Sequence, residues 1–131
     1  YTTPNLQALR VTKTQGVHIS FFHNKLISKI PFLNTIIHKT VATHSLQEIL
    51  KANKHFKPQY LFISPIFQTQ THRGAKALSR VELFKIINKA NLSNFILLGG
   101  MNLKKMKQIQ RLDSKKRIKG FAGINGFLLP E

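Results

Sequence analysis

The sequence contains no cysteine, and only four of its 131 residues are acidic. Without cysteine the chain cannot form a disulfide framework, a thiolate nucleophile, an iron–sulfur cluster or a cysteine-based zinc site. The acids are Glu48, Glu82, Asp113 and Glu131. So few carboxylates leave little for chemistry that depends on two paired acids or on carboxylate-bound magnesium.

Long hydrophobic runs are also lacking. The longest apolar runs, such as residues 95–98, are far too short to span a bilayer. The chain starts at Tyr1 without the basic flank and apolar segment of a signal peptide, and without an initiator Met. We therefore expect a cytoplasmic protein with no membrane partner, whose reading frame begins upstream.

The charge that is present is mostly of one sign. Twenty-one Lys and Arg residues give a net charge of +17, which favours an anionic partner such as a nucleic acid or a phosphorylated ligand. The basic residues are spread along the chain and are dense only at 104–107 and 115–117. The motifs of common nucleic-acid modules are missing, so a basic nucleic-acid-binding module is the less favoured alternative.

Segments with the patterns of strands and of helices alternate along the chain, and no linker divides residues 1–131, so we predict a single domain. Helices are predicted from Thr3 to about Thr14 and after the caps Ser45, Ser79 and Asn102. The predicted strands are Gly16–Ser20, Ile36–Thr43, Tyr60–Ile63, Phe95–Leu98 and Ile118–Ile124. This alternation predicts an α/β fold with a parallel sheet of five or six strands, and the apolar strands predict cover on both faces.

The predicted helices each have an apolar stripe. The segments 45–48 and 79–82 have the sequence of capping boxes, in which Ser and Glu satisfy the first backbone N–H groups of a helix. The side chains predicted to face the core are Leu46, Ile49, Leu50 and Ala52; Leu83, Phe84, Ile86, Ile87 and Ala90; and Leu103, Met106 and Ile109.

Polar and glycine residues recur where the predicted strands end. These residues are His18, Ser20, Thr43, His44, Ser64, Gly99, Gly100, Gly123 and Asn125. In parallel α/β folds ligands bind at this edge, and glycines there let backbone N–H groups approach a phosphate. A complete (β/α)₈ barrel needs at least roughly 200 residues, so the chain is either an open sheet or part of a barrel.

Several segments, in this order, resemble the thiamine phosphate synthase/TenI family. They are GVHI at 16–19, ATHSLQE at 42–48, QYLFISPIFQTQT at 59–71, LGGM at 98–101 and GFAGINGF at 120–127. The resemblance covers nearly the whole chain and implies a TIM-barrel type parallel barrel, of which these residues form about the third to eighth strands.

The resemblance implies a protein of thiamine biosynthesis. Synthases of the family join a hydroxymethylpyrimidine diphosphate to a thiazole phosphate and release pyrophosphate, mainly by charge stabilisation and positioning. His72 replaces the usual Lys of the phosphate loop, and Arg73 can supply the charge instead. The residues that match the phosphate site are Thr69, Thr71, His72, Arg73, Gly99, Gly100, Gly123, Ile124 and Asn125.

The synthases of the family use Mg²⁺, and this chain lacks the matching carboxylates. Thr3-Pro4 and residues 20–23 stand where the resemblance places the family's acids, and none of them is acidic. Ala42 replaces the family's usual Ser, and the basic residues of its second strand are not in this chain. We therefore expect no metal site, and phosphate binding that does not require magnesium.

Two alternatives to a synthase follow from the same resemblance. A TenI-type thiazole tautomerase needs no metal, and His44 matches its proton-transferring histidine, although synthases also carry this residue. A barrel that binds a phosphorylated thiazole or pyrimidine without turnover is the other alternative. An incomplete barrel also has exposed sheet edges, so we expect self-association through them.

Overall fold

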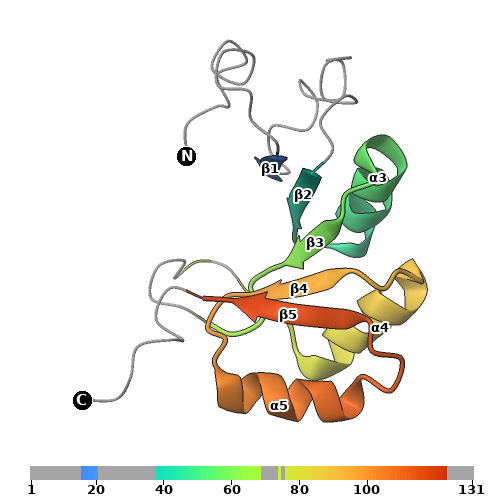
Figure 1. The fold of residues 1–131 in the computed structure, drawn as a ribbon. Coiled ribbons are helices and arrows are strands. Elements are labelled where there is room, and N and C mark those ends of the chain that lie inside the picture. The colour runs from blue at the N-terminus through green and yellow to red at the C-terminus, as the bar shows by residue number, and fades with distance from the viewer. Residues whose placement is uncertain (1–15, 21–37, 69–73, 75, 124–131) are drawn as a thin grey trace.

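The computed structural model describes residues 16–20, 38–68, 74 and 76–123, which form one parallel sheet and three helices (Figure 1). The order of the strands in the sheet is β1-β2-β3-β4-β5, and each is parallel to its neighbour. The predicted helix at Thr3–Thr14 lies outside the described residues. In chain order the elements are β1 (Gly16–Ser20), β2 (His38–Thr43), α3 (Leu46–Phe56), β3 (Tyr60–Ile63), α4 (Arg80–Ala90), β4 (Phe95–Leu98), α5 (Leu103–Leu112) and β5 (Ile118–Ala122).

Helices α3, α4 and α5 lie on the same side of the sheet, as Figure 1 shows. The strands follow their sequence order without a reversal, whereas a doubly wound sheet reverses its order and carries helices on both sides. Sequential parallel strands with all helices outside are the arrangement of a barrel wall. The α/β prediction is confirmed, and within the described residues the sheet is open, with β1 and β5 at its edges.

The core lies between the sheet and these helices. In β3 and β4 alternate residues are fully buried, namely Leu61, Ile63, Phe95 and Leu97, whereas Phe62 on the opposite face is half-buried. Burying one such side chain completely stabilises the fold by about 1.5–3 kcal/mol relative to leaving it exposed to water. The described helices cover one face of the sheet, and cover of the other face, which the apolar strands predict, stays a prediction.

The predicted helix stripes are confirmed in part. Ile49, Leu83, Ile87, Met106 and Ile109 are buried, because residues three and four apart share one face of a helix. The prediction that Leu50 and Leu103 face the core is wrong, because their side chains are 48% and 62% exposed. Leu50 lies one residue after Ile49 and so turns away from the buried stripe, and Leu103 is the first residue of α5, one turn before Met106. No described helix has the length and apolar character needed to cross a membrane.

The two predicted capping boxes differ in the structure. At α4 the box is complete: Ser79 accepts a hydrogen bond from the Glu82 N–H, and Glu82 accepts one from the Ser79 N–H. At α3 Ser45 accepts from the Glu48 N–H, but the Glu48 carboxylate accepts the N–H of His44, one residue before the cap, at 2.6 Å. The acid at the start of α3 thus holds the backbone of His44.

Candidate functional site

The described residues that the sequence assigned to a ligand site lie where parallel strands end. His44 follows β2, Ser64 follows β3, Gly99 and Gly100 follow β4, and Gly123 follows β5. Because the strands are parallel, their carboxyl ends meet at one edge of the sheet, as predicted. The remaining predicted residues lie outside the described ranges, so their approach to this edge stays a prediction: Thr69, Thr71, His72, Arg73, Ile124 and Asn125.

His44 has a defined ring orientation. Its Nδ1 lies 2.8 Å from the backbone carbonyl oxygen of Ser64, which can only accept, so Nδ1 carries the proton. The Ser64 hydroxyl lies 3.3 Å from the same nitrogen. In the neutral ring the lone pair is then on Nε2, and the His44 side chain is exposed at the edge of the sheet. A carbonyl that fixes the tautomer in this way leaves Nε2 as the basic nitrogen.

The segments that carry His44 and Ser64 are held together beneath the ring. Thr43 is fully buried, and its hydroxyl donates to the carbonyl oxygen of Phe62 at 2.8 Å. The N–H of Ser64 donates to the carbonyl oxygen of Thr43 at 3.2 Å. These bonds continue the pairing of β2 and β3 past the strand ends, so the distance between His44 and Ser64 is fixed by the sheet.

The Gly99-Gly100 turn is closely packed against the loop after β3. Both glycines have positive φ, 99° and 62°, a conformation that costs other residues energy. The N–H of Ile66 donates to Leu98 and that of Phe67 to Gly99. A Cβ on Gly100 would lie 2.8 Å from the Phe67 Cβ. The turn therefore requires glycine for two reasons: the positive φ of its backbone and the close approach of the loop after β3.

Lys105 adds a positive charge at this turn that the site prediction did not include. Its Nζ donates to the carbonyl oxygen of Gly100 at 2.7 Å and lies 4.2 Å from the centre of the Phe67 ring. Asn102 caps α5 by accepting from the Lys105 N–H at 2.9 Å. The first turn of α5 contains no acid, so its positive end is not neutralised there. The signal available in the sequence was a Lys three residues after a cap, Asn102, that follows the second glycine by two residues.

His18 lies on the sheet face away from the described helices. Its Nδ1 is 2.8 Å from the Thr40 hydroxyl, and its ring meets the edge of Phe62 at a centroid distance of 5.2 Å. The side chain is exposed on its open side, but the atoms packed around the ring remove part of its water, and this desolvation lowers its pKa. A neutral His18 is therefore favoured at neutral pH.

The described residues do not fit a carboxylate-bound magnesium ion. Their three acids are each engaged at the end of a helix: Glu48 with the N–H of His44, Glu82 with Ser79, and Asp113 with Ile118. No group of three His, Asp or Glu residues able to hold a metal occurs within the described ranges. Magnesium prefers several oxygen ligands in an octahedral arrangement, and no pair of acids at the strand ends of the described sheet supplies them.

A family model described as thiamine monophosphate synthase (TMP-TENI) matches residues 6–127. The chain belongs to this family. A comparison with curated proteins finds no match. Thiamine monophosphate synthase family proteins have a TIM-barrel-like fold, in agreement with the sequential parallel strands and the helices on one side. Membership supports a synthase-like or a TenI-like function and does not distinguish between them.

Proposed function

We propose that this chain binds a thiazole phosphate at the C-terminal edge of its sheet and isomerises the ring by proton transfer through His44, as a TenI-type thiazole tautomerase does. The observation that carries the proposal is the hydrogen bond from His44 Nδ1 to the Ser64 carbonyl oxygen, which places the lone pair on Nε2. A histidine in this state can take a proton at neutral pH and return it.

The proposed reaction is an isomerisation: it moves a proton from one position of the substrate to another and transfers no electrons to a second molecule. His44 Nε2 removes a proton from one atom of the thiazole ring system, and the same imidazolium returns a proton to another atom, so the ring becomes aromatic. The Ser64 carbonyl accepts the Nδ1 hydrogen throughout and stabilises the positive charge of the imidazolium. No metal takes part in these steps.

The phosphate group of the substrate is assigned to the Gly99-Gly100 turn. Two glycines permit close approach of backbone N–H groups, and the positive end of α5 and Lys105 favour an anion there. Arg73 and His72 stay the sequence-based candidates for further contacts. This division of roles, with the phosphate held between β4 and α5 and the base at the end of β2, leaves the ring of the substrate between them.

The second candidate is the synthase reaction, which the description of the matching family favours. It joins a hydroxymethylpyrimidine diphosphate to the thiazole phosphate and releases pyrophosphate with the help of magnesium. The same phosphate site would serve it. The described residues favour the tautomerase, because they offer a histidine with a fixed tautomer and no pair of carboxylates for magnesium.

The two candidates are separated by assaying one preparation for both reactions. For the tautomerase we expect aromatisation of the thiazole phosphate tautomer without magnesium, and a fall of about 10²- to 10⁴-fold in rate for His44→Gln. His55→Gln, at an exposed histidine in the last turn of α3, is the matched control and should retain the wild-type rate. Isomerisation by His44→Gln at the wild-type rate would overturn the proposal, and magnesium-dependent release of pyrophosphate would establish the synthase instead.

A further inference from the structure

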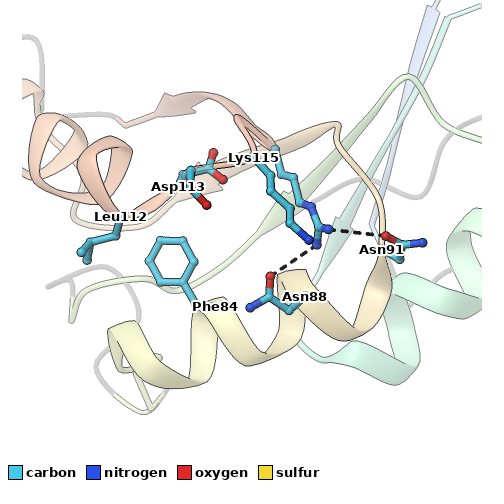
Figure 2. Close-up of a pocket in the computed structure, with 8 residues that line it drawn as sticks. Phe84, Asn88, Asn91, Leu112, Asp113 and Lys115 are labelled. Carbon is cyan, nitrogen blue, oxygen red and sulfur yellow. Dashed lines mark hydrogen bonds between the residues drawn. The ribbon is translucent and has the colours of Figure 1, made fainter.

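A pocket of about 470 Å³ lies at the opposite end of the sheet from the Gly-Gly turn (Figure 2). Asn91 lines it just before β4, and Arg117 lines it just before β5, so it sits at the amino ends of these parallel strands. His44 and Gly99 follow the carboxyl ends of their strands. The pocket is therefore separate from the site proposed above, and its size is within the usual range for small-molecule sites.

Arg117 is the principal charged group of this pocket. Its side chain is only 8% exposed, and it has no carboxylate partner among the described residues. The guanidinium donates to the carbonyl oxygen of Ile87 at 2.9 Å. It also donates to the side-chain oxygens of Asn88 and Asn91, each at 3.4 Å. A buried arginine is ordinarily paired with an anion, because neutral acceptors compensate only part of the cost of removing its charge from water.

The contact with Ile87 gives Arg117 a structural function, since it satisfies a carbonyl in the last turn of α4. That function does not use all of its donors. Nη1 contacts Ile87 and Asn88, Nη2 contacts Asn91, and a guanidinium has five N–H groups in one plane. Donors therefore remain on a fixed cation at the wall of the pocket.

The neighbouring side chains add further donors. Because arginine can only donate, the oxygens of Asn88 and Asn91 must face it. Figure 2 shows the Asn88 NH₂ group on the side of Phe84, whereas that of Asn91 points away from the other lining residues. The Lys115 side chain extends toward Asn88 in Figure 2, and Ser114 contributes a hydroxyl. The side chains of this wall thus present two cations together with amide and hydroxyl donors, which is the set that binds a phosphate group.

The remaining lining decides what else the ligand carries. The lining contains one acid, Asp113, against the two cations, so its net charge is positive. Asp113 is 8% exposed, and its carboxylate already accepts the N–H of Ile118 at 2.8 Å. Phe84 and Leu112 form an apolar wall, and Leu112 is 54% exposed although it is a large hydrophobic residue. An apolar group beside the phosphate would cover this surface.

We propose that this pocket binds a small phosphate ester with an apolar or aromatic group. The phosphate contacts Arg117, Lys115 and the Asn88 amide, and the apolar group packs against Phe84 and Leu112. The site is independent of the tautomerase or synthase reaction, because it lies at the other end of the strands.

The test uses the full chain labelled with ¹⁵N and phenyl phosphate as the probe. We expect chemical-shift changes at the amides of 113–117 and 91, the same signals with weaker affinity for inorganic phosphate, and none with phenol at equal concentration. Lys115→Gln should weaken phenyl phosphate binding by about three- to tenfold. Asn88→Leu should weaken it as well, and because both residues are exposed neither variant should disturb folding.

Two controls make the result decisive. Lys116→Gln removes the same charge from an exposed neighbour that does not line the pocket, and Lys105→Met removes a cation at the opposite edge; both should retain wild-type binding in the pocket. Equal losses for Lys115→Gln and Lys116→Gln would mean diffuse attraction to a basic surface and would overturn the proposal. So would shift changes confined to residues 99–105, or no saturable change at all.

Discussion

The ammonium group of Lys105 lies 2.7 Å from the carbonyl oxygen of Gly100, and the same group is 4.2 Å from the centre of the Phe67 ring. The side chain therefore connects the first turn of α5 with the glycine turn after β4 and with the loop after β3. A cation held in this way needs little reorganisation to meet an anion, because its position is already fixed by the protein.

Replacing Lys105 by Met should weaken the binding of a thiazole phosphate by about three- to tenfold, because one charge-assisted contact is lost at a partly exposed position. Isothermal titration at low salt measures the effect. Lys104→Met is the matched control, since Lys104 is exposed on the same helix. Equal affinities of the two variants would remove Lys105 from the phosphate site.

Replacing Gly100 by Ala should destabilise the fold by about 1–3 kcal/mol. The new Cβ would lie 2.8 Å from the Phe67 Cβ, and alanine would have to adopt a φ of 62°. Urea unfolding followed by circular dichroism gives the change in the free energy of unfolding. Gly74→Ala meets nothing within 4 Å and should change it by less than about 0.5 kcal/mol. A Gly100→Ala variant as stable as wild type would contradict the prediction, because the loop after β3 would then move away from the new Cβ without loss of stability.

Ser79→Ala should lower the free energy of unfolding by about 1 kcal/mol, because it removes the side-chain half of the capping box of α4. Hydrogen bonds from the Ser79 backbone and then from its side chain lower the pKa of Glu82. The contribution of Glu82 is therefore complete above its ordinary pKa of 4.5 and is lost as the pH falls through its lower value in the folded state. Urea titrations at several pH values measure both effects, with Ser93→Ala as the exposed-serine control. A cost for Ser79→Ala no greater than that for Ser93→Ala would contradict the prediction.

His18 should titrate below the ordinary histidine pKa of 6.5 in an NMR experiment, because its ring is partly desolvated. Folding favours the neutral ring, so its contribution to stability is present above pH 6.5 and is lost as the pH falls through the folded-state pKa. Phe62→Ala opens the ring to water and should raise the pKa toward its ordinary value. An unchanged His18 pKa in that variant would mean that Phe62 does not cause the desolvation.

Most of the described fold was predictable from local patterns. Gly16–Ser20, Tyr60–Ile63 and Phe95–Leu98 were predicted with the bounds that the structure gives them, because short apolar runs between turn residues are typical of strands in a parallel sheet. The caps Ser45, Ser79 and Asn102 were found because a side-chain oxygen there satisfies the first N–H groups of a helix. Leu50 and Leu103 were misplaced because their hydrophobicity alone does not state which face of a helix is covered.

The candidate site was predictable only in its location. Glycines and polar residues at strand ends indicated one edge of the sheet, and the structure places His44, Ser64 and Gly99 there. The sequence indicated a capping box at Ser45 but not that Glu48 would accept the N–H of His44 instead. It could not indicate that the Ser64 carbonyl would accept from the His44 ring, since the two residues follow different strands. Lys105 and the pocket around Arg117 were missed for the same reason.

Periodicity, caps and motifs are properties of neighbouring residues, and they were enough to predict the α/β class, the family and the edge of the sheet that carries the candidate site. Three features could be seen only in the folded chain: Nδ1 of His44 carries the proton, Lys105 lies at the glycine turn, and Arg117 is buried without an acid among the described residues. These features depend on contacts between segments 5 to 30 residues apart in the chain. Such contacts exist only once the sheet has brought the strand ends together, and their energies fall off within a few ångströms.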